Sequence, residues 1–355
     1  MFFTILIIFF CLIGLMVLHE LGHFLIAKKF GVDVEEFGVG YPPRIFGKRF
    51  KGTIYSLNLL PFGAFVRIKG EEGQQENIED SKSFAQKPIW QRSLIIFGGV
   101  GVFWIIAMII LTSVSFFWGI PTSVPDEWSE GDKTEVMITQ VIDNSPAYLA
   151  GIEMGDKIVG FNKMIDFQEF VRGNKEKEIT LNIKRGKDVF DINLIPEGSE
   201  VDKNQGAIGV ALARVSNIKY PWYSAPVQGV SITIKQTITI PIMIGTVLKN
   251  AIQGEKTPGA QFVGPIGIGK IMTNAFNQGI VNFLMFLSMI SIYLAVFNIL
   301  PIPALDGGKL LFLAIEKIKG KAVNPKTEQK ITLVFFGLLL GLMLFVTIKD
   351  IIGLF

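Results

Sequence analysis

The only two histidines of the 355-residue chain lie four positions apart, in the sequence His19-Glu20-Leu-Gly-His23. Residues four apart share one face of a helix, so both imidazoles can reach the same ion, and Glu20 lies on the flank of that face. Two histidines at this spacing bind Zn²⁺ in hydrolytic zinc sites, where the intervening glutamate acts as the base. The pattern therefore predicts a hydrolytic zinc centre, with His19 and His23 as metal ligands and Glu20 as the catalytic base.

The motif follows eighteen uncharged and mostly apolar residues. Ionisable groups inside a membrane-spanning helix are costly and are retained mainly at functional sites, which strengthens the prediction of a metal centre. No basic residue precedes this apolar run and no small-residue cleavage site follows it, so we interpret it as a retained transmembrane helix rather than a cleaved signal peptide. The single cysteine, Cys11, excludes an intrachain disulfide and a thiolate zinc cluster.

Composition indicates an integral membrane protein. Half of the residues are hydrophobic, 30 are phenylalanine, and the mean hydropathy is +0.45, whereas soluble globular chains are usually more polar. The formal net charge of +3 is too small to indicate a nucleic-acid partner. The expected surroundings are therefore the lipid bilayer.

Four segments are apolar over close to the roughly 20 residues that a membrane crossing requires. They are residues 2–27, 93–118, about 280–300 and 331–348. The connection 28–92 carries eleven Lys and Arg residues and the connection 309–330 carries six, so both are expected in the cytoplasm. This predicts a multi-pass protein of the cell membrane (inner or plasma membrane), with His19 roughly 13 Å inside the cytoplasmic end of its helix.

The predicted fold class is a polytopic α-helical membrane protein with about four transmembrane helices, a membrane-associated β-sheet and one extracytoplasmic α+β domain. Residues 226–256 are interrupted by Lys235 and Pro241, so we favour an element lying along the membrane over a fifth crossing. The predicted parts are a first transmembrane helix (1–27), a cytoplasmic-side β-hairpin or sheet with a loop (28–92), a second transmembrane helix (93–118), a PDZ-like domain (119–215), an amphipathic membrane-associated region (216–279), a third transmembrane helix with its broken end (280–308), a cytoplasmic loop (309–330) and a fourth transmembrane helix (331–353).

The extracytoplasmic segment is charged and rich in turns, and its predicted order of elements resembles that of a PDZ domain. Such a domain binds an extended peptide as an added strand. The Gly-Leu-Gly-Phe type of carboxylate loop is absent from its usual place, and residues 206–210 are the candidate to supply it in a permuted arrangement. Strands are predicted at 135–142, 158–162, 178–185 and 188–195, and helices from Asn144-Ser145 to Ala150 and near 166–173.

Because the chain has no further histidine, a third zinc ligand has to be a carboxylate or a backbone oxygen. Asp306 is the best candidate, since it ends the sequence Asn298-Ile-Leu-Pro-Ile-Pro-Ala-Leu-Asp306 and is followed by two glycines. The prolines interrupt a regular helix, and broken backbone at membrane depth is tolerated where it lines a cavity. The alternative is a simple helix-ending turn capped by Asp306. The need for a third ligand leads us to predict that Asp306 reaches the first helix.

HExGH at 19–23 and NxxPxPxLDGG at 298–308, in this order on different spanning segments, resemble the motifs of the site-2 proteases, which are intramembrane zinc metalloproteases. The sequence Gly264-Pro-Ile-Gly267 and the glycines at 38 and 40 support the resemblance. The order of parts is most similar to the bacterial branch that cleaves anti-sigma factors, although this chain has room for one PDZ domain where members often carry two. It departs from the family at 97–101, to which we assign no catalytic role.

The resemblance implies regulated intramembrane proteolysis. The expected partners are single-span membrane proteins, such as anti-sigma factors, whose transmembrane segments are cleaved after another protease has trimmed them outside the membrane. Zn²⁺ is then held by His19, His23 and Asp306. Asn298 either hydrogen-bonds the substrate backbone or the developing oxyanion, or packs against a neighbouring helix. The predicted sheet at 33–69 could pair with an unwound substrate.

Two other classes of protein are compatible with the metal ligands. A zinc-binding membrane scaffold would use the metal structurally, and Glu20 would then be dispensable. A metal transporter would use the three ligands as a transit site, but the sequence shows neither an inverted repeat nor further intramembrane carboxylates that would form a path. We therefore favour the protease.

Overall fold

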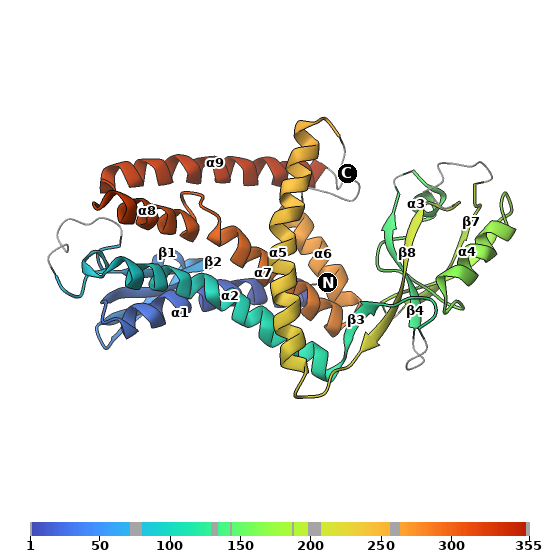
Figure 1. Ribbon diagram of the computed structural model, residues 1–355, viewed down its shortest axis with the longest axis horizontal. Helices are drawn as coiled ribbons and strands as arrows, with labels where there is room; N and C mark the ends of the chain where they lie inside the picture. Colours follow the sequence, from blue (N-terminus) through green and yellow to red (C-terminus); the bar gives the residue numbers. More distant parts are fainter. Residues whose placement is uncertain are drawn as a thin grey trace. The chain divides into compact units, whose positions relative to one another are not determined.

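The computed structural model describes residues 2–71, 80–128, 134–142, 144–186, 188–197, 207–255 and 263–352. The chain forms two compact units, and each is described by itself (Figure 1). The first unit is mainly helical and contains Met1–Ile110, Val230–Thr273 and Phe286–Phe355. The second unit is built on a β-sheet and contains Leu111–Gly229 and Asn274–Met285.

Five helices in the described part of the chain are long and apolar enough to cross a membrane. They are α1 (Phe2–Lys29), α2 (Ile89–Phe117), α5 (Ala225–Ile252), α7 (Ile280–Ile299) and α9 (Pro325–Ile352). Four of them lie where the sequence predicts spans, and α5 is the additional candidate. The number of crossings by itself stays a prediction, because length and composition do not show which helices cross.

Helix α5 differs from the other four in direction. Figure 1 shows it running across the direction of α2, α7 and α9. It contains Pro241, and its exposed apolar residues include Ile234, Ile238 and Ile242, which follow one another at four-residue spacing and so line one face. The indole N–H of Trp104 on α2 donates a hydrogen bond to Oγ1 of Thr237 at 3.0 Å. Whether α5 crosses the membrane or lies along it stays a prediction.

The segment after α1 forms a long antiparallel hairpin of β1 (Val34–Phe50) and β2 (Thr53–Ile68). The turn consists of Lys51 and Gly52, both with positive φ (46° and 86°), which is the geometry of the two-residue turns that match strand twist. Each strand bends, so residues 36–39 lie between two segments of β2, 54–57 on one side and 64–67 on the other. The hairpin therefore makes a small sheet where the sequence predicts one.

A buried carboxylate stabilises this sheet. Glu36 is 4% exposed and accepts hydrogen bonds from Oγ of Ser56 at 2.6 Å and Nε of Arg44 at 3.1 Å. Arg67 lies at 3.7 Å from the same carboxylate. Burial alone would raise the pKa of Glu36, but the hydrogen bonds from Ser56 and Arg44 and the charges of both arginines hold this pKa below its ordinary value.

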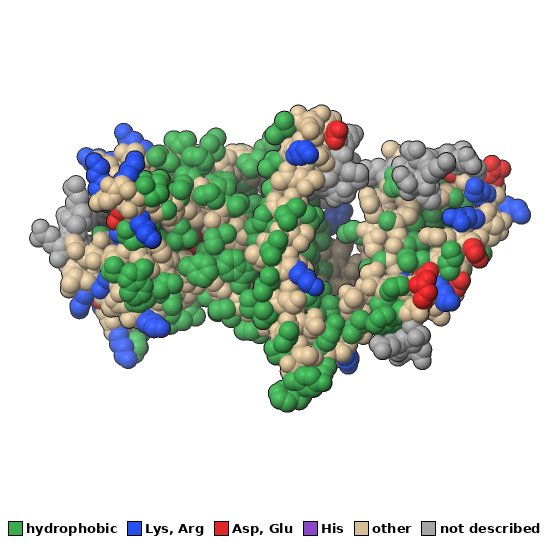
Figure 2. All heavy atoms as spheres, in the orientation of Figure 1, with side chains coloured by type: hydrophobic (Ala, Val, Ile, Leu, Met, Phe, Trp, Pro, Cys, Tyr) green, Lys and Arg blue, Asp and Glu red, His purple; other side chains and the backbone are tan. Residues whose placement is uncertain are grey.

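Two shorter helices are α6 (Pro265–Asn277), whose residues up to Thr273 belong to the first unit, and α8 (Asp306–Lys319), which lies wholly in the first unit. The N-terminus of α6 is capped from α9, because the carboxylate of Asp350 accepts hydrogen bonds from the backbone N–H groups of Gly264 and Gly267. Helix α8 is followed by Gly320, which caps its C-terminus with a φ of 69°. Figure 2 shows Lys and Arg side chains gathered at the left end of this unit and hydrophobic side chains over its middle, as expected if one end lies in the cytoplasm.

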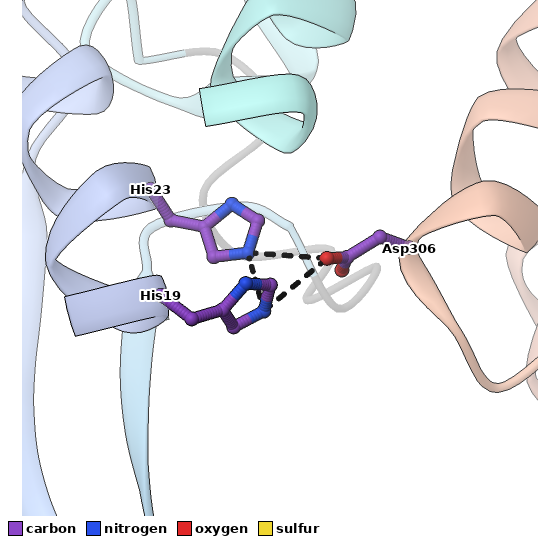
Figure 3. Close-up of side chains that lie close together, drawn as sticks. All are labelled: His19, His23 and Asp306. Carbon is purple, nitrogen blue, oxygen red and sulfur yellow. Dashed lines mark hydrogen bonds and ion pairs between the residues drawn. The ribbon is translucent and has the colours of Figure 1, made fainter. Parts of the chain in front are cut away.

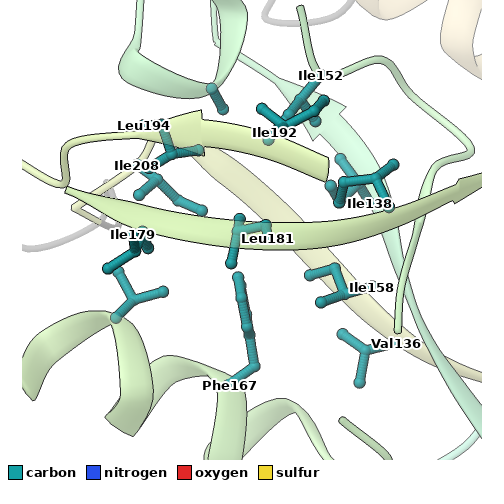
Figure 4. Close-up of a cluster of buried hydrophobic side chains, with 13 residues drawn as sticks. Val136, Ile138, Ile152, Ile158, Phe167, Ile179, Leu181, Ile192, Leu194 and Ile208 are labelled. Carbon is teal, nitrogen blue, oxygen red and sulfur yellow. The ribbon is translucent and has the colours of Figure 1, made fainter. Parts of the chain in front are cut away.

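The second unit contains a six-stranded sheet in the order β3-β8-β4-β5-β6-β7. Alternating residues of its strands and the inner face of α4 bury a common apolar core around Phe167, Leu181 and Ile138 (Figure 4). The elements are β3 (Ile120–Ser123), β4 (Thr134–Val141), α3 (Pro146–Leu149), β5 (Lys157–Ile158), α4 (Met164–Gly173), β6 (Ile179–Arg185), β7 (Asp188–Leu194) and β8 (Val210–Ile218).

The order of strands and helices from β4 to β7 follows the sequence prediction, with a shorter β5. Strand β8 was not predicted, and it lies between β3 and β4 in the sheet. Of the predicted carboxylate loop at 206–210, Gly206 lies outside the described residues, and Gly209 has a φ of 74° directly before β8. Residues 72–79 of the predicted loop and 256–262 of the predicted amphipathic region also lie outside the described residues.

Candidate active site

Helix α1 presents both histidines on one side, one turn apart. Their ring planes are nearly perpendicular at 83°, and their Nε2 atoms lie 3.2 Å from each other. The side chains of His19 and His23 are 12% and 9% exposed, so both are largely withdrawn from solvent. The helical spacing of four residues thus brings two imidazole nitrogens to one point, as the sequence predicts.

Asp306 reaches the same point from the other end of the chain. Helix α7 ends at Ile299, the following segment is not helical, and Asp306 is the first residue of α8. Its Oδ2 lies 3.3 Å from Nε2 of His19 and 3.4 Å from Nε2 of His23 (Figure 3). The structure therefore brings together the three residues that the sequence suggested as metal ligands.

The tight turn before Asp306 depends on the two glycines that follow it. A Cβ atom at Gly307 would lie against the carbonyl oxygens of Ile299 and Leu300, and one at Gly308 would lie 2.5 Å from the carbonyl oxygen of Ile302. Side chains at these positions would separate α8 from the end of α7. The glycines thus let the first turn of α8 fold back against the broken segment.

The three ligand atoms have the spacing that a tetrahedral zinc ion requires. With bonds of about 2.05 Å, an ion at the centre of a tetrahedron places its ligand atoms about 3.3 Å apart. The observed separations are 3.2, 3.3 and 3.4 Å. Oδ2 of Asp306 is buried and has no hydrogen-bond partner within the described ranges. Two imidazoles and a carboxylate are also a common ligand set of catalytic zinc, so the residues fit this metal.

Helix α2 supports the histidines from behind. Nδ1 of His23 lies 2.9 Å from the carbonyl oxygen of Ile95, the usual partner geometry for a metal-binding histidine. Gly99, one turn further along α2, faces the same imidazole, and a Cβ atom there would lie 2.6 Å from Cδ2 of His23 and closer still to Nε2 and Cε1. The ring of His23 therefore occupies space that only a glycine leaves open.

Glycines also allow helices α1 and α2 to approach each other closely. A Cβ atom at Gly22 would lie 2.8 Å from the backbone carbon of Gly98, and one at Gly98 would lie 3.0 Å from the carbonyl oxygen of Gly22. From sequence alone, residues 97–101 had no predicted catalytic role and no predicted connection with the histidines. The available signal was a group of glycines within an apolar helix, since small residues allow helices in membranes to approach closely.

The two remaining predicted site residues are Glu20 and Asn298. Glu20 follows His19 on α1, as in the sequence motif. Asn298 donates its side-chain N–H to the carbonyl oxygen of Leu294 at 2.9 Å, within its own helix. Nearby, Nζ of Lys309 on α8 pairs with Oε1 of Glu71 at 2.6 Å and ties α8 to the end of the hairpin segment. The role of Asn298 toward a substrate thus stays a prediction.

A buried cluster of two histidines and one aspartate, with a glutamate beside the first histidine and several apolar helices around it, defines a membrane-embedded metallohydrolase. Comparison with known proteins agrees with this class. The model of peptidase family M50 matches residues 7–342. The chain therefore belongs to peptidase family M50, the zinc metalloproteases of the site-2 type, which are multi-pass membrane proteins.

Individual relatives cover nearly the whole chain. A protein of Clostridium perfringens, provisionally named a zinc metalloprotease, is 34% identical over 344 residues, which is 96% of each chain. The regulator of sigma-W protease RasP of Bacillus subtilis is 29% identical over 443 residues and covers 100% of both chains. The zinc metalloprotease RasP of Bacillus licheniformis is 27% identical and covers 95% of this chain and 96% of its own.

Proposed function

We propose that this zinc metalloprotease cleaves peptide bonds inside the transmembrane segments of single-span membrane proteins, with His19, His23 and Asp306 as zinc ligands. The observation that carries the proposal is the convergence of three ligand atoms at 3.2–3.4 Å, contributed by α1 and α8. The name of the B. subtilis relative links it to the control of a sigma factor. Anti-sigma factors are accordingly the substrate class that we favour, in regulated intramembrane proteolysis.

Glu20 is the proposed base because it neighbours the first ligand on the same helix. When bound, zinc supplies Lewis acidity, which lowers the pKa of water at the site and polarises the scissile carbonyl. The carboxylate of Glu20 accepts a proton from the attacking water and then gives it to the nitrogen of the leaving amine. His19, His23 and Asp306 hold their ligand atoms in place, and the surrounding apolar helices limit the entry of bulk water.

A peptide bond in a transmembrane helix is shielded by the hydrogen bonds of that helix, so the substrate has to unwind before cleavage. The sheet of β1 and β2 supports this step, because a strand edge can pair with an extended segment. Its place in the chain directly after α1 keeps it covalently close to His23. In this proposal the sheet holds the unwound substrate in an extended conformation during hydrolysis.

The second unit is proposed to be a PDZ-like domain outside the cytoplasm that selects substrates by the size of their external part. Its support is the order of elements from β4 to β7 and the position of β8 beside β4.

The size-selection proposal is tested by removing most of this unit. Ser123 and Val215 are partners in the β3–β8 ladder, so an Asn-Gly turn can join them and replace residues 124–214. This variant should keep zinc and cleave long-ectodomain substrates faster than wild type. Loss of cleavage of a short-ectodomain substrate by the folded variant would contradict the filter.

The catalytic proposal is tested with purified protein and a single-span reporter. Glu20→Gln should keep about one zinc per chain and lose cleavage, because the metal ligands remain and the base is removed. His19→Ala, His23→Ala and Asp306→Asn should lose zinc as well as cleavage.

Glu169→Gln is the matched control, since Glu169 is exposed on α4 in the second unit, and it should behave as wild type. Full zinc occupancy in Asp306→Asn would exclude this residue as the third ligand. Substantial turnover by the Glu20→Gln variant would exclude Glu20 as the base, whatever the zinc content of that variant.

A further inference from the structure

The two histidines differ in how their rings are held. A metal-binding imidazole usually donates its second ring N–H to a carbonyl or a carboxylate, which fixes the orientation of the ring. His23 has such a partner in the carbonyl oxygen of Ile95. Nδ1 of His19 is buried and has no hydrogen-bond partner in the part of the chain that the structure describes. Another contact must therefore orient the ring of His19.

That contact is the side chain of Phe103 on α2. Its ring stacks on the imidazole of His19, with 4.7 Å between the ring centroids and 12° between the planes. Phe103 is only 2% exposed. Its carbonyl oxygen accepts a hydrogen bond of 2.7 Å from Oγ of Ser291, a fully buried residue on α7. Phe103 is thus held by α7 through its backbone and contacts α1 through its ring.

Ile95, Gly99 and Phe103 follow one another at intervals of four residues and so lie on one face of α2. Each contributes a different property to the histidine pair. The carbonyl of Ile95 accepts from His23, Gly99 leaves room for the same ring, and Phe103 covers the face of His19. One face of α2 therefore orients both imidazoles, although none of its three residues belongs to the ligand set.

We propose that Phe103 is a positioning residue of the zinc centre, and that it acts through His19. Its ring keeps Nε2 of His19 directed toward Asp306. The face of an aromatic ring carries negative partial charge, so it also favours the imidazole when that ring becomes more positive on binding a metal. An aliphatic side chain of similar volume fills the space without this preference. The inference rests on the ligand set proposed above.

The test compares Phe103→Leu with Phe97→Leu. Phe97 lies on the same helix, is 41% exposed and contacts Trp104 rather than a histidine. Zinc affinity is measured by competition with a chelator, and the visible spectrum of the Co²⁺-loaded protein reports the geometry of the ligands. Phe103→Leu should bind zinc roughly 10-fold more weakly, as is usual when a supporting residue is lost, and should change the Co²⁺ spectrum. Phe97→Leu should match wild type in both measurements.

An unchanged affinity and spectrum in Phe103→Leu, alongside lost zinc binding in His19→Ala, would overturn the positioning role and leave the ligand set intact. Zinc retained by His19→Ala would contradict the ligand set itself. If Phe103→Leu does not elute as a folded protein, Phe103→Met fills the site with a flexible chain and gives the same test. Ser291→Ala, which removes only the anchor of the Phe103 backbone, should show a smaller change in the same direction.

Discussion

Replacement of Gly99 by alanine is expected to weaken zinc binding by displacing His23. A Cβ atom at this position would lie within 2.6 Å of three atoms of the imidazole, and Cδ2 is the most distant of the three. Ordinary van der Waals contact begins near 3.4 Å. Relief of the contact with Cδ2 alone requires a movement of 0.8 Å (3.4 minus 2.6), and Nε2 and Cε1 lie closer still, so either the ring or α2 must move by more than 0.8 Å.

A shift of this size is large for the metal centre. It lengthens the 2.9 Å hydrogen bond to Ile95 or tilts the ring, and it disturbs the distances of 3.2 and 3.4 Å from Nε2 of His23 to the other two ligand atoms. Loss of the partners that orient a ligand typically lowers metal affinity about 10- to 100-fold. Alanine favours a helix over glycine by about 1 kcal/mol, so a weaker helix would not explain the loss.

The assay is zinc affinity by chelator competition, together with thermal unfolding at fixed free zinc. Because zinc stabilises the folded state according to its affinity, a tenfold loss removes about 1.4 kcal/mol of zinc-dependent stability. Gly101→Ala is the control on the same helix, since a Cβ atom there would meet only carbon atoms of Phe97 at 3.7 and 3.9 Å. If Gly99→Ala and Gly101→Ala bind zinc equally well, the steric argument is wrong.

Two further predictions concern the membrane topology and the sheet. Single cysteines replacing the exposed residues Ser81 and Asn324, in a protein without its native cysteine, should resist an impermeant thiol reagent in intact cells. A cysteine at exposed Lys175 should react, and the reverse pattern would refute the cytoplasmic location of the basic segments. Glu36 has a pKa below its ordinary value of 4.5, so its stabilising effect is complete above that pH and is lost as the pH falls toward the lower, folded-state pKa. The Glu36→Gln variant should thus have a lower melting temperature than wild type at pH 7, and the two melting temperatures should converge at acid pH. A difference that stays constant with pH would refute a stabilising role for the charged Glu36 carboxylate.

The sequence could predict those parts of the site that depend on interactions between residues close together in the chain. The spacing of His19 and His23 determines by itself that both imidazoles lie on one helix face, because the helical repeat is local. The lack of other histidines left a carboxylate as the available side-chain ligand, and Asp306 follows a backbone broken by prolines. The positions of the long helices are likewise local, because they depend on runs of apolar residues.

Only the tertiary structure decided what surrounds these ligands. The meeting of Asp306 with α1 spans almost the whole chain, and its 3.3 and 3.4 Å separations depend on how α8 packs, which no local pattern determines. The face of α2 that supports the histidines also depends on tertiary packing. A phenylalanine and a glycine in an apolar helix do not indicate a metal site in the sequence, and their role is seen only where packing places them against His19 and His23. Strand β8 was missed for a related reason, because its place between β3 and β4 depends on pairing with strands far away in sequence.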